Sequence, residues 1–331
     1  MADVSVIIPV WNTQDYLNQC LDSVQNQTLP KLDIICVDDG SSDRSVEIIR
    51  ARSDSDSRVR LLSQEHQGPG AARNFGIDQA RGEYLYFLDS DDWIVPDALE
   101  RLVHRARGDS ADLLFFESIN GERTSHGGWR VQRLRHQLAT RLWKGVDYLE
   151  PALAANAYSF SPCLQLSRRS LVRDSAVRYP LHDMSEDSVF TIQLTLRADR
   201  VSYRPEQLFY RRLRPGSLTT RGNPVGVIRG ALHSWLAISS SRREYQAGSS
   251  TARALEVLAQ RHWRHALNQW DVLPQTIKTS LTWQNILENE EQVSLRFLNE
   301  ARRGRPRRAA VRFLRRRKPL VIEPAPSSSV G

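Results

Sequence analysis

Apolar runs and helical spacings alternate along the first 110 residues. Residues 4–11 (VSVIIPVW) form a continuous, β-branched run, which is typical of a strand covered on both faces. The next apolar positions fall on one face of a helix: Leu17, Cys20, Leu21 and Val24. Three more strand patterns occur in this part of the chain, at residues 32–38, 59–63 and 84–88. Helical patterns follow the second and third strands. Such alternation predicts right-handed crossovers and an α/β fold with a doubly wound, mainly parallel sheet.

The remaining sequence is less regular. Residues 111–118 and 200–213 have strand-like patterns, and residues 185–198 have a helical one. From residue 226 to about 300 the pattern is helical, and its tryptophans are expected to pack between helices. The predicted organisation is two successive parts of an α/β domain, a helical extension and a basic, disordered tail, at residues 1–110, 111–220, 221–300 and 301–331.

Acidic residues follow two of the predicted strands. Asp38 and Asp39 come after the second strand, and Asp89, Asp91 and Asp92 come after the fourth. In an open α/β sheet, ligands bind at the carboxyl ends of the strands, so the two groups are expected to converge on one site.

Asp89 and Asp91 are two residues apart, so in an extended segment both side chains project to the same side. Two carboxylates in that position can share Mg²⁺ or Mn²⁺ and leave coordination positions open for phosphate oxygens. A solvated acidic turn before a helix starting near Asp97 is the alternative explanation.

Composition narrows the function classes only a little. The net charge of +8 suggests an anionic partner, such as a nucleotide, a nucleic acid or an anionic lipid. The three cysteines, Cys20, Cys36 and Cys163, have no zinc-type spacing and are expected to be buried, inert thiols. No apolar run approaches the roughly 20 residues of a membrane-spanning helix. The N-terminal sequence lacks a signal-peptide pattern, which favours the cytoplasm.

Four ordered motifs carry a family resemblance: VSVIIPVWN, CVDDGSSD, GPGAARNFGI and YLYFLDSDDW. Together they resemble the nucleotide-sugar-binding half of the family 2 inverting glycosyltransferases, which have the GT-A fold. The resemblance is close over residues 3–110 and looser to about residue 220. It implies that residues 1–110 are the nucleotide-sugar-binding half of the domain and that residues 111–220 are the acceptor-side half. It implies an enzyme that moves a sugar from a nucleotide-diphosphate donor, such as a UDP-sugar, to a glycan or glycolipid hydroxyl, with a divalent cation.

The resemblance also implies roles for individual residues on the donor side. Asp39 matches a carboxylate that accepts a hydrogen bond from uracil, and Pro9 and Val10 match backbone positions lining the base. Arg73 matches a residue facing the nucleotide, although its sequence position also fits a solvent-facing helix arginine. Asp89 matches the carboxylate near the ribose and metal, and Asp91 matches the metal ligand.

On the acceptor side, the segment MSEDSVF resembles the family motif that carries the general base. Asp187 matches the base and Glu186 is its neighbour and alternative. The same acids also suit the first turn of a helix capped by Ser185, where the helix dipole would lower their pKa. The later segment YRRLRPGSLT resembles the one that closes over the diphosphate, and its candidates are Arg212, Arg214 and Ser217.

The segment 301–318 holds nine arginines and one lysine. Its basic residues, Arg302 to Lys318, would suit a peripheral position on anionic lipid at the inner face of the membrane, or a solvated tail. Nucleic acid is disfavoured as a partner because aromatic residues are scarce in this segment.

Two other enzyme classes and one class of binding protein are the alternatives. A sugar nucleotidyltransferase should show a Gly-rich, Arg-Lys signature after the first strand, and a dinucleotide dehydrogenase should show Gly-x-Gly-x-x-Gly there. The sequence PVWNTQDY has neither. A non-catalytic protein that binds nucleic acid or membrane through the basic tail would bind with a steep salt dependence that survives Asp91→Asn.

Overall fold

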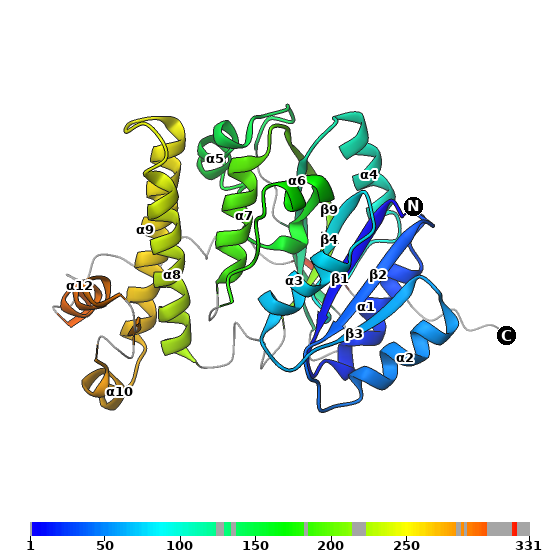
Figure 1. The fold of residues 1–331 in the computed structure, drawn as a ribbon, viewed down its shortest axis with the longest axis horizontal. Coiled ribbons are helices and arrows are strands. Elements are labelled where there is room, and N and C mark those ends of the chain that lie inside the picture. Colours follow the sequence, from blue (N-terminus) through cyan, green and yellow to red (C-terminus); the bar gives the residue numbers. More distant parts are fainter. Residues whose placement is uncertain are drawn as a thin grey trace.

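The structure is a computed structural model. It describes residues 2–123, 129–133, 137–181, 185–213, 223–282, 286–287, 290–302 and 320–322. The strands within these residues form one curled, mixed sheet in the order β10-β7-β6-β8-β4-β1-β2-β3, and β9 pairs with β6 and β5. The doubly wound α/β fold predicted from the sequence is confirmed, as is the presence of helices after it (Figure 1).

The parallel part of the sheet comes from the first 90 residues. Its elements are β1 (Val4–Val10), α1 (Gln14–Gln25), β2 (Leu32–Asp38), α2 (Ser45–Ser55), β3 (Val59–Ser63), α3 (Pro69–Gln79) and β4 (Tyr84–Phe87). Every residue of β1, β2 and β4 is buried, which explains why their sequences are mainly apolar. In α1 the four residues of the predicted apolar face are the buried ones.

The second part of the sheet contains antiparallel pairs. Its elements are β5 (Trp93–Ile94), α4 (Ala98–Gly108), β6 (Leu113–Arg123), β7 (Trp129–Arg133), α5 (Gly145–Ala154), β8 (Gln165–Arg168), α6 (Arg169–Asp174), α7 (Glu186–Arg197) and β9 (Val201–Leu213). Strand β8 lies between β4 and β6 and is antiparallel to both, whereas β9 runs parallel to β6.

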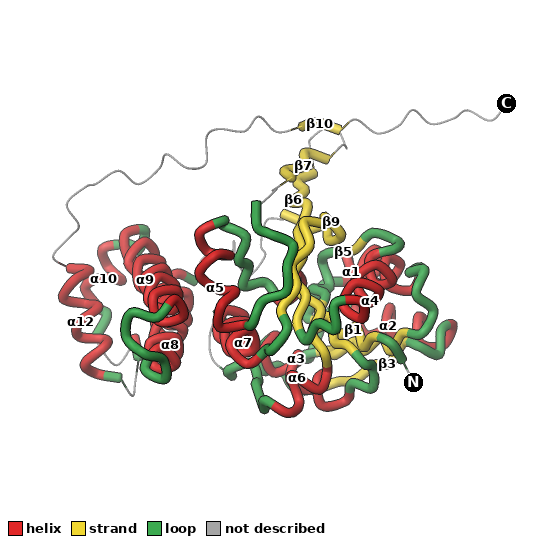
Figure 2. The backbone as a smooth tube through the Cα atoms, turned by 90° about the horizontal axis from the view of Figure 1, so that it is seen from above, coloured by secondary structure: helices red, strands yellow, loops and turns green. Residues whose placement is uncertain are grey.

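Helices cover both faces of the sheet (Figure 2). One buried apolar cluster packs α1, α2 and α4 against the first face. Another packs α3, α5, α6 and α7 against the second face. The helix that carries Asp187, α7, therefore lies on the same face of the sheet as α3, which carries Arg73.

Further helices follow in the C-terminal part of the chain, and the first two of them pack beside α7 and α5. They are α8 (Pro224–Arg242), α9 (Ser250–Asp271), α10 (Gln275–Ser280) and α12 (Glu291–Arg302), and a short strand, β10 (Leu320–Ile322), pairs with β7. Trp263 and Trp270 are buried in a cluster of their own, with edge contacts to Phe297 at 5.9 and 6.0 Å between ring centroids. Trp235 lies 5.0 Å from Trp263. These three tryptophans are helix-packing residues, as predicted, and Trp283 lies outside the described residues.

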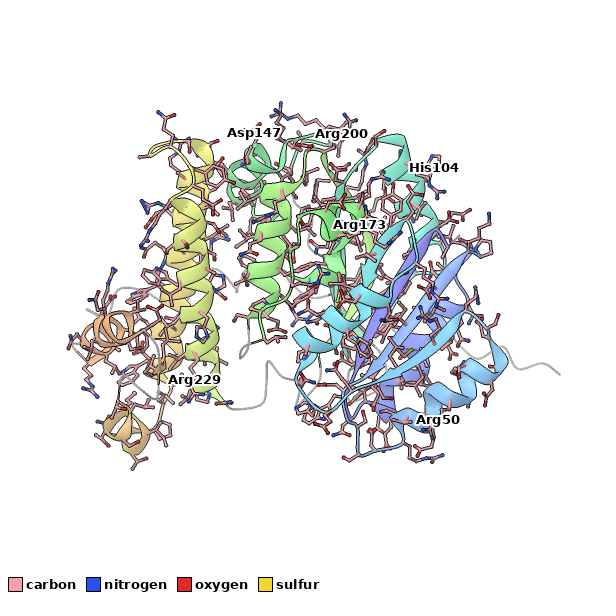
Figure 3. All side chains as sticks on the ribbon, viewed as in Figure 1. Arg50, His104, Asp147, Arg173, Arg200 and Arg229 are labelled. Atoms are coloured by element: carbon pink, nitrogen blue, oxygen red, sulfur yellow. The ribbon has the colours of Figure 1, made fainter. Side chains whose placement is uncertain are left out.

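Charged side chains cover the outer surfaces of the helices. Arg50 on α2 and His104 on α4, both labelled in Figure 3, are exposed. The three cysteines are buried free thiols, as the sequence predicted. Within the described part of the chain, no helix combines the length and apolar character needed to cross a membrane.

Candidate active site

The carboxyl ends of β1, β2 and β4 bring the candidate residues together. Pro9 pairs with Val37 across the parallel β1–β2 ladder. The amide of Asp39 donates to the carbonyl oxygen of Val10 at 2.9 Å, so the two strand ends remain joined beyond the sheet. The acidic turn of residues 89–92 follows β4 directly. This convergence was predicted from the order of the motifs.

Asp39 is held by the loop that follows β3. Its side chain is almost fully buried, and its two carboxylate oxygens accept three hydrogen bonds. The donors are Gln64 Nε2 at 2.7 Å, the Gln67 amide at 2.9 Å and the Gly68 amide at 2.8 Å. His66 Nδ1 lies 2.8 Å from Asp39 Oδ2 and 3.1 Å from the backbone oxygen of Asp39. Residues 64–68 therefore close over the carboxylate that the resemblance assigns to the base.

Arg73 lies at the centre of the site. It is buried, and its guanidinium contacts three carboxylates. Nη2 donates to Asp89 Oδ1 at 2.8 Å, and Nη1 contacts Asp187 Oδ1 at 3.0 Å and Glu186 Oε1 at 3.3 Å. The alternative of a solvent-facing helix arginine is wrong. Arg73 connects the turn after β4 to the first residues of α7, and so joins the two sides of the site.

Asp187 has a pKa raised to about 7. Desolvation at the crowded centre of the site is the main cause, although 32% of the side-chain surface still contacts solvent. The positive charge of Arg73 lowers this pKa, and the negative charges of Glu186 and Asp89 raise it. The helix dipole was expected to lower the pKa, and that expectation is wrong because burial outweighs it. A carboxylate with a pKa near neutrality is suited to accept a proton at physiological pH.

The capping role considered for Ser185 also differs from the structure. Ser185 is at the N-cap position of α7, but its φ is +89° and its side chain makes no capping hydrogen bond. Its carbonyl oxygen instead accepts from Ser234 Oγ on α8 at 3.2 Å. The C-terminal helices therefore support the end of α7 that carries Glu186 and Asp187.

The acidic turn has an exposed part and a buried part. Asp89 and Asp91 are partly exposed, whereas Asp92 is only 5% exposed and accepts from the Arg212 amide at 2.7 Å. Burial raises the pKa of Asp92, and the charges of Asp91 and Asp89 raise it further. Asp92 thus anchors β9, whereas Asp89 and Asp91 are partly exposed and Asp89 also pairs with Arg73.

Arg212, on β9, joins this acidic turn to α1. Its Nε donates to the Asp91 carbonyl oxygen at 2.9 Å, and its Nη2 donates to Gln19 Oε1 at 2.6 Å. The guanidinium also lies over the Tyr16 and Trp93 rings, at 5.0 and 4.8 Å from the centroids. Its predicted contact with the nucleotide stays a prediction. Arg214 and Ser217, the other candidates in this segment, lie outside the described residues, as do the basic residues 303–318.

Two functional residues escaped the sequence reasoning. Arg211 is exposed, and its charge lowers the pKa values of both Asp187 and Asp92, so it lies near both carboxylates. Side chains along a strand point alternately to its two sides, so residues 211 and 212 lie on opposite sides of β9. This alternation was the sequence signal that could have identified Arg211. Asn74 clamps the backbone of Tyr179, donating to its carbonyl oxygen at 2.8 Å and accepting from its amide at 2.9 Å.

The charge of the acidic turn bears on whether a divalent cation could be held there. Burial raises the pKa of Asp92, and the charges of Asp91 and Asp89 raise it further, which indicates negative charge that a cation would neutralise. Across the ranges that the structure describes, no three His, Cys, Asp or Glu side chains form a metal-binding group. Mg²⁺ is commonly held by one or two carboxylates together with substrate phosphates, so Asp89 and Asp91 would suit a metal that arrives with a diphosphate.

Curated proteins of similar sequence are bacterial. The chain is 34% identical over 227 residues to EpsH of Bacillus subtilis, whose name marks it as a glycosyltransferase, covering 66% of this chain and 63% of that protein. It is 32% identical over 214 residues to a poly(ribitol-phosphate) beta-glucosyltransferase of Bacillus spizizenii, covering 62% of this chain and 32% of that protein. The chain thus spans less than two thirds of the length of either relative.

Solved structures show the same fold. Residues 1–349 of TarS from S. aureus, in complex with UDP-GlcNAc, superpose with a TM-score of 0.62 at 19% identity, covering 92% of this chain and 91% of TarS 1–349. The mannosyltransferase PcManGT of Pyrobaculum calidifontis, with GDP-Man and Mn²⁺, gives 0.55 at 17% identity, covering 91% and 82%. Residues 5–175 match the family described as Glycosyl transferase family 2. The GT-A fold and the family predicted from the four motifs are confirmed: this chain belongs to glycosyltransferase family 2.

Proposed function

We propose that the protein is an inverting glycosyltransferase that moves a sugar from a nucleoside-diphosphate donor to a hydroxyl of a glycan or lipid-linked glycan. The observation that carries this proposal is the position of Arg73, 2.8 Å from Asp89 and 3.0 Å from Asp187. One cation contacts both the turn assigned to the donor and the carboxylate assigned to the acceptor. The transferred sugar would lie beside Arg73, between these two carboxylates.

The reaction requires a base on the acceptor side. In an inverting transfer the acceptor oxygen attacks the anomeric carbon, and the bond from that carbon to the diphosphate oxygen breaks with its electron pair leaving on the diphosphate. Asp187 would accept the proton of the attacking hydroxyl, and its pKa of about 7 suits this role. Glu186, 11% exposed and also in contact with Arg73, is the alternative base.

The leaving diphosphate needs positive charge. Asp91 and Asp89 would hold Mn²⁺ or Mg²⁺, which supplies Lewis-acid stabilisation of the departing phosphate oxygens when bound. Arg211 is exposed and lies near Asp92 and Asp187, so it would add a fixed positive charge to this part of the site. Arg212 would act indirectly, by holding the backbone of the acidic turn.

The donor base is proposed to be uracil. Support comes from the resemblance at Asp39 and from TarS, which was solved with UDP-GlcNAc. PcManGT was solved with GDP-Man, so GDP is the first alternative to test. For the acceptor, the B. spizizenii relative is named as acting on poly(ribitol-phosphate), which is consistent with a role in cell-surface polysaccharide or glycoconjugate synthesis. The segment Arg302–Lys318 would bring the enzyme to anionic lipid, where lipid-linked acceptors are found.

Calorimetric titration with UDP, with and without Mn²⁺, tests the donor site. We expect saturable binding that requires the metal and is lost in Asp91→Asn. Asp97→Asn is a matched control, because Asp97 lies just beyond the turn and pairs with Arg101 on its own helix. The absence of UDP and GDP binding by the unmodified protein with Mn²⁺ or Mg²⁺ would reject the proposal.

Assays of the released product, together with the Asp91→Asn variant, separate the rival functions. A sugar nucleotidyltransferase should release pyrophosphate from a nucleoside triphosphate and a sugar phosphate, whereas the proposed enzyme should release UDP from a UDP-sugar. A protein that works only through its basic tail should bind nucleic acid or anionic vesicles equally well with and without Asp91→Asn. The family match favours the transferase over both.

A further inference from the structure

The carboxylate of Asp39 has its acceptor positions filled by the protein itself. A carboxylate offers about four lone-pair positions, and Asp39 accepts from three donors at 2.7 to 2.9 Å. Two of these donors are the backbone amides of Gln67 and Gly68, and the third is the side chain of Gln64. The remaining side faces His66, whose Nδ1 lies 2.8 Å from Oδ2 and 3.1 Å from the backbone oxygen of Asp39. A further N–H group can reach this carboxylate only if one of the side chains leaves.

His66 has the features of a bound heterocycle. Its imidazole stacks on the Trp11 ring, with the ring centroids 4.4 Å apart and the planes inclined by 17°. Its Nδ1 lies 2.8 Å from Asp39 Oδ2 and must carry the proton, because an ionised carboxylate only accepts. Trp11 immediately follows Val10 at the end of β1, where the resemblance places the base.

A pyrimidine base would make the same two contacts. It is a planar heterocycle that can stack on an aromatic ring, and its imide N–H can donate to a carboxylate. We propose that the imidazole of His66 occupies the nucleobase position in the free protein, and that it must swing out before a nucleoside diphosphate binds. This inference rests on the proposed function, because it deepens the account of the donor site.

The backbone around His66 is fixed, so the movement belongs to the side chain. A Cβ added to Gly40, whose φ is +74°, would lie 3.1 Å from the backbone nitrogen of His66, so the two loops are in close contact. The Gln67 and Gly68 amides hold the following residues to Asp39. In contrast, the side chain of His66 is 50% exposed, so rotation about its own bonds can carry the ring into solvent.

Such a side chain lowers the apparent affinity for the donor. Only the fraction of molecules with the ring displaced can accept the base, and the measured Kd rises by the inverse of that fraction. The ring would also shield buried Asp39 and Trp11 while no donor is bound. Removing it should therefore tighten nucleotide binding, whereas removing a residue that contacts the base directly should weaken it.

Calorimetry on His66→Ala and His66→Phe tests this inference, with UDP and pyrophosphate as ligands in the presence of Mg²⁺. We expect His66→Ala to bind UDP about three- to tenfold more tightly than the unmodified protein, as the loss of one hydrogen bond and one stacking contact implies. His66→Phe keeps a ring on Trp11 and should gain no affinity. Pyrophosphate lacks a base, so its affinity should be the same in all three proteins.

The outcomes separate this inference from the proposed function. Weaker or unchanged UDP binding by His66→Ala would overturn the inference while leaving the transferase intact. An equal gain for UDP and pyrophosphate would also overturn it, since the effect would then not concern the base. If none of the three proteins binds UDP or GDP, the proposed function fails and the inference fails with it. Thermal unfolding of each variant confirms that the folded protein is being titrated.

Discussion

Arg73 and Asp187 are 114 residues apart in the sequence, and their side chains form an ion pair with 3.0 Å between Nη1 and Oδ1. Arg73 is 4% exposed and Asp187 is 32% exposed, so the pair lies at the boundary between the core and the site. The same guanidinium contacts Asp89 and Glu186. A single buried cation thus balances three carboxylates that would otherwise repel one another.

Asp187→Asn should abolish sugar transfer while leaving donor binding intact. The amide keeps the size of the side chain but cannot accept the acceptor proton, and general bases contribute about a hundred- to ten-thousand-fold to a rate. Release of UDP from a panel of UDP-sugars measures the effect, and calorimetry with UDP measures binding. Glu186→Gln is the matched control. A larger loss in Glu186→Gln than in Asp187→Asn would move the base to Glu186.

The transfer rate should rise with pH through about 7. The folded-state pKa of Asp187 is raised to about 7 and the base works only when ionised, so the rate should fall about tenfold per pH unit below that value. The charge of Arg73 lowers this pKa, so Arg73→Gln should move the midpoint to higher pH. Initial rates of UDP release between pH 5.5 and about 9 check both points. A profile that stays flat between pH 6 and about 8 would contradict the assignment.

The parallel half of the fold could be predicted because its signals are local. Residues close together in the sequence form the apolar runs of β1, β2 and β4 and the apolar face of α1. Each of these is buried as expected. The acidic residues after the second and fourth strands also predicted that Asp39 and Asp89 lie at the same edge of the sheet, where β1 separates their two strands. These inferences need only the periodicity of the chain and the rule that ligands bind at the carboxyl ends of the strands.

The rest depends on contacts between distant residues. Strand β8 inserts antiparallel between β4 and β6, and α5 packs on α7. Neither the pairing of β8 nor this helix contact can be predicted from consecutive residues. The raised pKa of Asp187 reflects burial by neighbours from other elements, which a helix-terminus argument cannot include. Similarly, the closure of residues 64–68 over Asp39 is a tertiary arrangement, and the sequence QEHQG shows no sign of it.

Asn74→Ala should destabilise the acceptor side of the site. Asn74 makes two hydrogen bonds to the backbone of Tyr179, a buried residue whose ring lies 5.3 Å from the Arg73 guanidinium carbon. Losing both bonds leaves a backbone amide and a carbonyl group without partners, at a cost of about 2 kcal/mol in the free energy of unfolding. Urea denaturation measures the change. Asp78→Ala, on the exposed end of the same helix, should cost much less, and equal losses would argue against the clamp.

Gly145→Ala should be more damaging than any of these changes. A Cβ at Gly145 would lie 1.6 Å from the backbone oxygen of Thr195, so α5 would have to move away from α7, the helix that carries Asp187. Backbone atoms cannot rotate aside as a side chain can, and we expect a loss of about 3 kcal/mol or more in the free energy of unfolding. Gly108→Ala is the control, because a Cβ there meets no atom within 4 Å. It should change stability by less than about 1 kcal/mol. Comparable unfolding midpoints for the two variants in urea would show that α5 can shift at little cost, and that its close contact with α7 does not fix the position of the catalytic helix.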